Sequence, residues 1–460
     1  MAYQSVNPNT GQIERSFGAH SATDVDAALA QAHGCFGAWR QTRFAERATV
    51  MTRAAHILRS RVDEFAVPMT LEMGKRIAEA RGEVELSADI LDYYATHAEA
   101  FLAPQPLAPS HGSAHIQSSP LGVLFGVQPW NFPYYQLARF AAPNLMAGNV
   151  VLVKHAASVP QCAEAFEALW REAGAPAGVY TNLRISHEQV NRLIDDERVR
   201  GVALTGSVDA GRQVAARAGQ AMKKSTMELG GNDALIVLED ADIDQAVRWA
   251  VWAKMNNMGQ CCVAAKRLIV VDSVADRFLD SFQSALTRLR VGDPMDLATT
   301  LAPLSSEEAL EKLLDQVQRS VAHGALLVMG GQRIERPGSF MWPTILDNIH
   351  PGNPAYREEL FGPVALFFRV KDQDAAVNLA NDSDFGLGAS IFTRDVPRGL
   401  SLASRIDCGM VFINHPTWTA AELPFGGVKQ SGYGRELSSL GIHEFVNKKL
   451  VRVSDVGDPP

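Results

Sequence analysis

Short apolar runs alternate with helical stretches from residue 121 onward, and this alternation restricts the fold more than any other feature. The runs at 121–127, 149–153 and 202–204 read as strands, and 161–173 reads as a helix between them. Strands that are apolar on both faces belong in parallel sheets with helices on each side. A second series of such runs lies at 234–238, 268–271, 325–328 and 365–368. The pattern therefore predicts doubly wound α/β construction.

The first hundred residues have a different pattern, which predicts helices. Apolar residues recur at helical spacing in four segments. These segments are 24–40, 44–61, 62–75 and 84–102. Residues 103–119 contain three prolines and a short alternating stretch, so we expect an exposed ribbon there. The strand-like end at 448–453 pairs either with this ribbon or with another subunit.

Length and composition exclude several classes of protein. A chain of 460 residues is too long for one core, so two or three domains are expected. The net charge of −8 argues against nucleic acid as a partner. No basic leader precedes an apolar stretch, and no run is long enough to cross a membrane. The five cysteines are odd in number and form no CxxC pair, so we expect no disulfide framework, no metal site and a cytoplasmic location.

Three short runs carry residues that suit covalent chemistry on a carbonyl group. They are Asn257–Arg267 (NMGQCCVAAKR), Met227–Asn232 (MELGGN) and Pro129–Pro133 (PWNFP). A thiolate in the first can attack, a carboxylate in the second can handle protons and water, and an amide in the third can donate to an oxyanion. Taken singly, a cysteine is usually a small buried hydrophobe, a glutamate a surface residue and an asparagine a turn former.

The three runs in this order resemble those of the aldehyde dehydrogenase superfamily. Further matching runs are Gly206–Gly211 (GSVDAG), Glu359–Pro363 (ELFGP), Asn381–Gly388 (NDSDFGLG) and Leu423–Glu436 (LPFGGVKQSGYGRE). The resemblance spans essentially the whole chain. It implies the aldehyde dehydrogenase fold, with a Rossmann-like cofactor-binding domain from 1–105 and 121–229, and an α/β catalytic domain at 230–440. It also implies a small β oligomerisation ribbon and tail from 106–120 and 441–460, in a homodimer or homotetramer.

The resemblance assigns catalytic roles to three residues. Cys262, rather than Cys261, occupies the nucleophile position of the Gly-Gln-x-Cys pattern. Glu228 matches the general base that activates water, and Asn131 matches the amide that binds the thiohemiacetal oxygen together with the backbone N–H of the nucleophile. Cys261 is either a harmless neighbour or a redox partner of Cys262.

The resemblance also implies a nicotinamide cofactor. The Gly-Ser-x-x-x-Gly variant places a helix N-terminus near the pyrophosphate. NAD-preferring members often carry a glutamate where this chain has Ala157, so Lys154 and Ser158 have room for a 2′-phosphate and NADP is favoured over NAD. The expected cofactor-binding residues are Trp130, Lys154, Ala157, Ser158, Gly206, Ser207, Gly211, Leu229, Glu359 and Phe361.

The substrate prediction rests on Arg139 and on a closer resemblance. Arg139 lies two helical turns after Asn131, where many members of the family carry an aromatic residue. A guanidinium at this position is suited to bind a carboxylate at the far end of the substrate. A salt bridge or surface contact explains an arginine equally well. The runs at 412–416 and 436–449 resemble those of the shorter bacterial succinate-semialdehyde dehydrogenases. The expected substrate is therefore succinate semialdehyde, and the expected substrate residues are Arg139, Phe132, Cys261, Trp418 and Phe425.

Other functions stay open at this point. A broader aliphatic or aromatic aldehyde oxidiser is the main alternative. A CoA-acylating enzyme is disfavoured because Glu228 is present to serve hydrolysis. A structural relative without turnover would be expected to lack one of the three catalytic residues, and a redox-sensing protein centred on Cys261 and Cys262 would bind cofactor without oxidising aldehydes.

Overall fold

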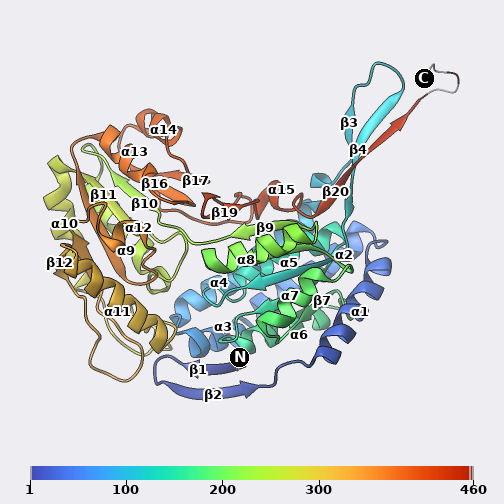
Figure 1. Cartoon of the computed structure of the whole chain (residues 1–460), viewed down its shortest axis with the longest axis horizontal. Helices are drawn as coiled ribbons and strands as arrows, with labels where there is room; N and C mark the ends of the chain where they lie inside the picture. The colour runs from blue at the N-terminus through green and yellow to red at the C-terminus, as the bar shows by residue number, and fades with distance from the viewer. Residues whose placement is uncertain (1–2, 455–456, 458–460) are drawn as a thin grey trace.

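The computed structural model describes residues 3–454 and residue 457. Two sheets lie in separate lobes, and a narrow ribbon projects from the body (Figure 1). The expected α/β fold is confirmed. Residues 1–2 of the expected cofactor domain, and residues 455–456 and 458–460 of the expected tail, lie outside the described residues.

The first lobe is built on a six-stranded sheet in the order β19-β9-β8-β5-β6-β7. All neighbours pair in parallel except β19, which is antiparallel to β9. Its strands are β5 (Val123–Gln128), β6 (Val150–His155), β7 (Tyr180–Asn182), β8 (Val199–Thr205), β9 (Lys224–Glu228) and β19 (Gly432–Tyr433). The helices that connect them are α5 (Tyr135–Ala147), α6 (Pro160–Glu172), α7 (His187–Asp195) and α8 (Val208–Gln220).

The N-terminal segment adds helices to this lobe, but its start differs from the prediction. The first hundred residues are expected to be helical, but residues 3–17 form a hairpin of β1 (Tyr3–Asn7) and β2 (Gln12–Phe17). Every residue of β2 is exposed or half-buried, so it lacks the apolar alternation that marks a strand in a sequence. The helices that follow are α1 (Ala22–Trp39), α2 (Phe44–Ser60), α3 (Val62–Met73) and α4 (Ile77–Phe101). Helix α4 begins at Ile77 rather than at the expected residue 84.

The second lobe is built on a seven-stranded sheet in the order β12-β13-β14-β11-β10-β16-β17. Its strands are parallel except for the edge strand β12, which is antiparallel to β13. They are β10 (Ala234–Val237), β11 (Arg267–Val271), β12 (Leu326–Met329), β13 (Thr344–Asp347), β14 (Val364–Val370), β16 (Gly388–Phe392) and β17 (Met410–Ile413). The accompanying helices are α9 (Ile243–Met255), η1 (Asn256–Gly259), α10 (Asp272–Leu286), α11 (Glu307–Ala322), α12 (Pro354–Arg357), α13 (Gln373–Asn381) and α14 (Val396–Ala403).

Each lobe has its own hydrophobic core. One cluster joins the six-stranded sheet to the N-terminal helices, and the other fills the seven-stranded sheet and its helices. Three short elements belong to neither of these two sheets. They are β15 (Phe385–Gly386), which pairs antiparallel with β18 (Val428–Lys429), and the helix α15 (Ser438–Gly441).

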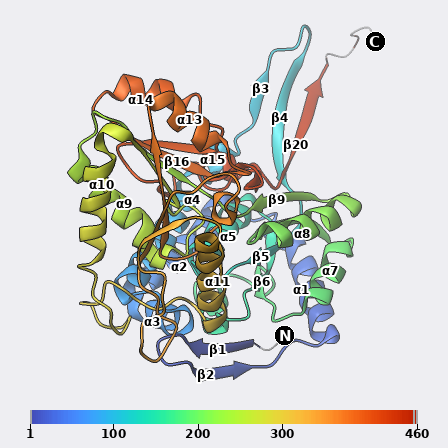
Figure 2. The same ribbon diagram turned by 60° about the vertical axis from the view of Figure 1, so that its left-hand side comes forward.

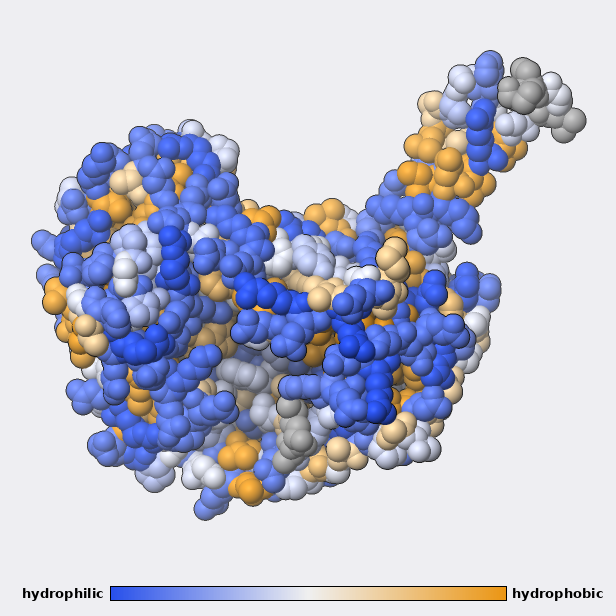
Figure 3. Space-filling model, viewed as in Figure 1, coloured by the Kyte–Doolittle hydropathy of each residue, from blue (hydrophilic) through white to orange (hydrophobic). Residues whose placement is uncertain are grey.

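The projecting ribbon contains β3 (Gln105–Leu107), β4 (Ser113–Pro120) and β20 (Val446–Val453). Strand β20 pairs along the whole of β4, which is the first of the two pairings expected for the end of the chain. The ribbon stands away from the body in both ribbon views, and apolar residues gather on its surface (Figures 1, 2 and 3). Leu450 there is 63% exposed. In the described part of the chain, no helix is both long and apolar enough to span a membrane.

Candidate active site

Two cavities meet at Cys262. The first has a volume of about 630 Å³ and lies where β8 and β9 face the loop before β14. The second has a volume of about 360 Å³ and lies between α4, α5 and α9. Cys262 and Gln136 line both cavities. A thiol at this junction can react with a molecule in one cavity while a second molecule occupies the other.

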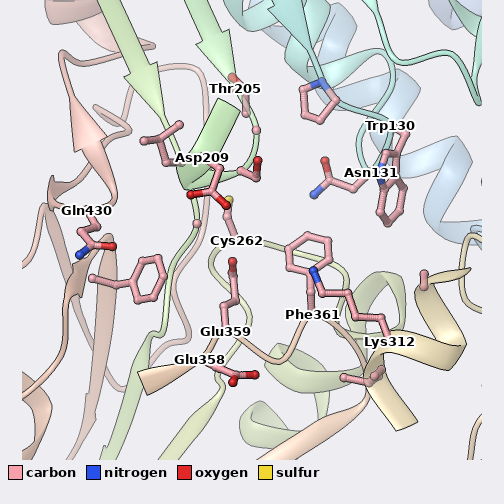
Figure 4. A pocket seen from close by; sticks show the side chains of 18 of the residues that line it. Trp130, Asn131, Thr205, Asp209, Cys262, Lys312, Glu358, Glu359, Phe361 and Gln430 are labelled. Carbon is pink, nitrogen blue, oxygen red and sulfur yellow. The ribbon is translucent and has the colours of Figure 1, made fainter. Parts of the chain in front are cut away.

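Most of the predicted cofactor residues line the first cavity (Figure 4). These are Trp130, Gly206, Ser207, Leu229, Glu359 and Phe361. The Ser207 side chain accepts from the backbone N–H of Ala210 and caps α8, whose N-terminus opens at the cavity. Exposed backbone N–H groups at a helix start suit a phosphate.

The other four predicted cofactor residues lie outside the lining of this cavity. Gly211 is buried within α8 against Leu229, and Lys154, Ala157 and Ser158 lie at and after the end of β6. Ser158 is exposed. Burial lowers the pKa of Lys154, whose Nζ donates to the carbonyl of His155.

All five predicted substrate residues line the second cavity. Phe132, Arg139, Cys261, Trp418 and Phe425 form its walls together with Tyr135 and Trp252. The indoles of Trp252 and Trp418 lie 5.2 Å apart between ring centroids. The walls therefore include a group of aromatic rings and the Arg139 cation, and carboxylates of α4 complete the lining: Glu79, Glu83, Glu85 and Asp89.

An unusual backbone path brings Cys262 to the junction. Asn257 and Met258, between α9 and the nucleophile, have φ angles of 50° and 56°. Non-glycine residues rarely adopt this left-handed region, and when they do they often cluster at functional sites. Contact with the Cys261 thiol and burial raise the pKa of Cys262 well above its usual range, whereas the nearby Lys266 and Arg139 cations oppose that rise.

The amide of Asn131 is held from several sides. Its Oδ1 accepts from Nε2 of Gln136 at 2.9 Å, and its Nδ2 donates to the carbonyl of Gln260 at 3.0 Å. Its backbone carbonyl accepts from Nζ of Lys75 at 2.9 Å and from Nδ2 of Asn257 at 2.8 Å. This network fixes which edge of the amide carries the N–H groups, and one N–H of Nδ2 is available beyond the bond to Gln260.

Glu228 ends β9 and is 2% exposed. Neither carboxylate oxygen has a hydrogen-bond partner among the described residues. Burial raises the pKa of Glu228 well above its usual range, and the Glu436 carboxylate acts in the same direction. A buried carboxyl with free oxygens and a raised pKa has the properties of a general base for a water molecule.

Gly230 and Gly231 follow Glu228 because two other groups approach the backbone there. A Cβ on Gly230 would lie 2.4 Å from Oε2 of Glu359, and one on Gly231 would lie 2.4 Å from the carbonyl oxygen of Cys262. The Gly-Gly pair therefore permits the nucleophile loop and the Glu359 carboxylate to pack against the end of β9. Close approach of these groups is the reason that residues without a Cβ are needed at both positions.

Arg139 forms a buried ion pair with Glu436. Its Nη1 donates to the Tyr135 hydroxyl at 3.1 Å and its Nη2 to Oγ1 of Thr205 at 3.2 Å. Burial disfavours the charge, but the Glu436 carboxylate raises the pKa of Arg139, which therefore stays cationic. The ion pair is one of the two explanations that the sequence left open for Arg139. A contact with substrate stays a prediction.

Sequence patterns missed several residues that the structure brings to the site. Gln136 orients Asn131, Lys75 holds the Asn131 loop, and Glu436 pairs with Arg139. Lys75 reaches the site from a position far away in the chain, and no local pattern marks it. Glu436 ends the matching run Leu423–Glu436, but that run gives no sign of its pairing with Arg139. The sequence offers one signal for Lys266, which is a charged residue beside the apolar run at 268–271. Within residues 3–454, no group of three His, Cys, Asp or Glu side chains is arranged to hold a metal ion.

Comparisons with known proteins agree with this geometry. The model of the aldehyde dehydrogenase family matches residues 1–451. A Deinococcus radiodurans protein named succinate-semialdehyde dehydrogenase [NADP(+)] is 48% identical over 100% of this chain and 96% of its own length. An Escherichia coli K12 protein named succinate semialdehyde dehydrogenase [NAD(P)+] Sad is 42% identical over 97% of each chain. The crystal structure of succinic semialdehyde dehydrogenase from Streptococcus pyogenes in complex with NADP+ is 44% identical, with a TM-score of 0.97 over 99% of this chain and 100% of that one.

Proposed function

The chain belongs to the aldehyde dehydrogenase family, and from this premise we propose that it oxidises succinate semialdehyde to succinate, with NADP preferred to NAD. The observation that carries the proposal is the position of Cys262, whose thiol lines both cavities. The larger cavity takes the cofactor and the aromatic one takes the aldehyde.

The residues of the chain divide the reaction into two stages. Cys262 Sγ adds to the aldehyde carbon, and the resulting oxyanion accepts from Asn131 Nδ2 and the backbone N–H of Cys262. A nicotinamide cofactor held in the larger cavity would supply the hydride acceptor, and loss of a hydride leaves the Cys262 adduct as a thioester. Glu228 then takes a proton from water as the water oxygen attacks the thioester carbon. The C–S bond then breaks, and the Cys262 thiolate takes the proton back from Glu228. Together with the proton that the thiol lost before its attack, the products are the acid, the free thiol, one proton and the reduced cofactor.

The first cavity has the features that a dinucleotide needs. It joins the N-terminus of α8 to the Cys262 thiol, and its polar groups include Ser207 and Glu359. Trp130 and Phe361, whose ring centroids lie 6.0 Å apart, provide apolar surface for a flat ring. We assign the pyrophosphate to the α8 N-terminus and the nicotinamide ribose to Glu359.

The preference for NADP rests on the loop after β6. Ala157 is half-buried and uncharged where an acid would repel a 2′-phosphate, and Ser158 is exposed beside it. Lys154 lies at the end of the same strand. Relatives whose names include NADP(+), such as the one from Deinococcus radiodurans, support this assignment.

The choice of substrate rests on Arg139. A guanidinium carries five N–H groups, of which three face Glu436, Tyr135 and Thr205, so two stay available for a distal carboxylate. A cavity of about 360 Å³ is ample for a four-carbon aldehyde. The Arg139–Glu436 ion pair is the specific observation that favours the second candidate, a broader oxidiser of aliphatic or aromatic aldehydes, because pairing weakens the attraction for an anion.

A panel of aldehydes with both cofactors tests the proposal. We expect the highest kcat/KM for succinate semialdehyde with NADP, and lower values for butanal and benzaldehyde. Equal or higher values for the uncharged aldehydes would favour the second candidate. Absence of turnover with every aldehyde, while NADP still binds, would favour the redox-sensing alternative.

The assembly and its location are further parts of the proposal. The exposed Leu107, Leu450 and Val453 on the ribbon are suited to contact another copy of the chain in a homodimer or homotetramer. All five cysteines are free, which suits a reducing cytoplasm. Light scattering on the purified protein would measure the number of copies, and a monomer would refute this role for the ribbon.

A further inference from the structure

Lys266 is fully buried four residues after Cys262. Its Nζ donates to the carbonyl of Cys262 at 2.6 Å and to that of Cys261 at 2.8 Å, and it pairs with Oε1 of Glu359 at 3.1 Å. An ammonium has three N–H donors, and here each has an acceptor. Hydrogen bonds to carbonyl groups with no part in the reaction would explain a buried ammonium by stability alone. The Lys266 ammonium instead binds two segments that both have a part in the proposed reaction.

The partners of Lys266 belong to the two halves of the proposed reaction. Glu359 lines the cofactor cavity, and its Oε1 also accepts from the backbone N–H of Gly231 at 3.0 Å. Phe361, which lines the same cavity, has its ring centroid 5.9 Å from Nζ of Lys266. The carbonyls of Cys261 and Cys262 belong to the nucleophile loop. A single side chain therefore connects the proposed ribose site to the loop that carries the thiol.

We propose that Lys266 is a positioning residue that couples cofactor binding to the reactivity of Cys262. The proposal rests on the function proposed above, because it uses Glu359 as the ribose ligand. When ribose hydroxyls hydrogen-bond to the Glu359 carboxylate and shift it, the Lys266 ammonium that pairs with it moves as well. The same ammonium is bonded to the carbonyls of Cys261 and Cys262, so the nucleophile loop moves with it. The nucleophile loop then takes its reactive position in the cofactor complex.

Electrostatics add a second effect of the same residue. The Lys266 cation lowers the pKa of Cys262 and so favours the thiolate. Cys261, Arg139 and Tyr135 also act on or face this thiol, and the Glu359 carboxylate lines the same cavity. Cys261 raises the pKa of Cys262 and Arg139 lowers it, so loss of Lys266 would leave Arg139 as the remaining nearby cation.

The same region offers a matched control in Lys254. It is 1% exposed, lies on α9, and its Nζ has no hydrogen-bond partner among the described residues. Burial and the nearby Lys266 lower the pKa of Lys254 well below its usual range. Lys254→Met therefore removes a buried lysine of equal size without removing a hydrogen bond to the nucleophile loop.

Alkylation by iodoacetamide tests the coupling without any need for turnover. The rate of modification of Cys262 is measured across pH in a Cys261→Ser background, with and without saturating NADP, and NADP affinity is measured by calorimetry. The variants are Lys266→Met, Lys266→Arg and Lys254→Met. We expect Lys266→Met to slow alkylation near neutral pH by about tenfold, to move its pH profile upward and to abolish the response to NADP. Lys266→Arg should restore part of each effect, and Lys254→Met should behave like the parent.

Two outcomes overturn the proposal. One is a Lys266→Met profile that coincides with that of Lys254→Met. The other is a thiol in the parent whose alkylation rate does not respond to NADP. If Lys266→Met fails to fold, Glu359→Gln serves instead, and its alkylation should respond to NADP less than that of the parent. Failure of the proposed function is distinguishable, because it would appear as weak NADP binding or lack of turnover in the unmutated protein.

Discussion

Nε2 of Gln136 donates to Oδ1 of Asn131 at 2.9 Å, which commits the Asn131 amide to presenting Nδ2 as the donor edge. An asparagine amide is nearly symmetric in shape, and this bond acts together with the one from Nδ2 to the Gln260 carbonyl to keep the two edges from exchanging. Gln136 is 3% exposed and lines both cavities beside Cys262. It thus defines the orientation of the proposed oxyanion donor.

Gln136→Met should therefore weaken catalysis through Asn131. A lost hydrogen bond of about 0.5–1.5 kcal/mol corresponds to a kcat lower by about 2- to 12-fold. The KM for NADP should not change. In an Asn131→Ala background the same substitution should have almost no further effect on kcat. Additive losses in the double variant would assign Gln136 a separate role.

The pH dependence of deacylation should follow Glu228. A base acts in its ionised form, and burial together with Glu436 raises the pKa of Glu228, so deacylation should increase with pH over a range well above pH 4.5. Glu436→Gln removes the like charge and leaves Arg139 unpaired, and both changes lower the pKa of Glu228. The rise in kcat should then move to lower pH. Stopped-flow measurements at a series of pH values give the deacylation rate of the parent and of Glu436→Gln. A pH profile that stays in place or moves to higher pH in the variant would contradict the influence of Glu436 on Glu228.

Cofactor choice should depend on the charge at residue 157. Ala157→Glu should lower the NADP/NAD ratio of kcat/KM by about 10-fold or more, because the carboxylate repels a 2′-phosphate and can bind ribose hydroxyls. Ala157→Gln is the control of equal size without charge and should change the ratio much less. Equal effects of the two variants would indicate steric rather than electrostatic selection.

Arg139 can be tested without leaving a buried charge unpaired. Arg139→Ala alone would strand Glu436, and breaking a buried pair costs about 3–5 kcal/mol of stability. The double variant Arg139→Met with Glu436→Gln removes both charges. We expect its kcat/KM for succinate semialdehyde to fall by about 10- to 150-fold relative to the unmutated protein. Butanal should be almost unaffected, and equal losses for both aldehydes would make Arg139 structural.

The parts of the fold that a sequence can predict are those with a strong local pattern. Strands β5, β6, β10 and β11 are buried on both faces and their apolar runs are unmistakable. Strand β2 is largely exposed and carries no such run, so its pairing with β1 could not be predicted. Strand β19 has two residues, and its place on β9 depends on a contact across about half the chain.

The candidate site divides in the same way. Short sequence motifs contain Cys262, Asn131 and the helix-capping Ser207, and the chemistry of each motif can be predicted from its own residues. The supports of these residues come from elsewhere in the chain: Lys75 reaches the Asn131 loop, Glu436 reaches Arg139, and Glu359 reaches Lys266. Glu359 and Glu436 lie in recognisable motifs, but the pairing of a side chain with a distant partner leaves no periodic signal, so only the fold reveals these contacts.

The most direct test of the proposed function is to trap the covalent intermediate. Glu228→Gln should form the thioester and hydrolyse it slowly, so the enzyme is mixed with succinate semialdehyde and NADP, quenched in acid, digested and sequenced by mass spectrometry. We predict a succinyl group on Cys262, absent when NADP is omitted and absent in Cys262→Ser, whereas Cys261→Ser retains it. A succinyl group on Cys261, or none in Glu228→Gln while the protein binds NADP and aldehyde, would contradict the proposed function.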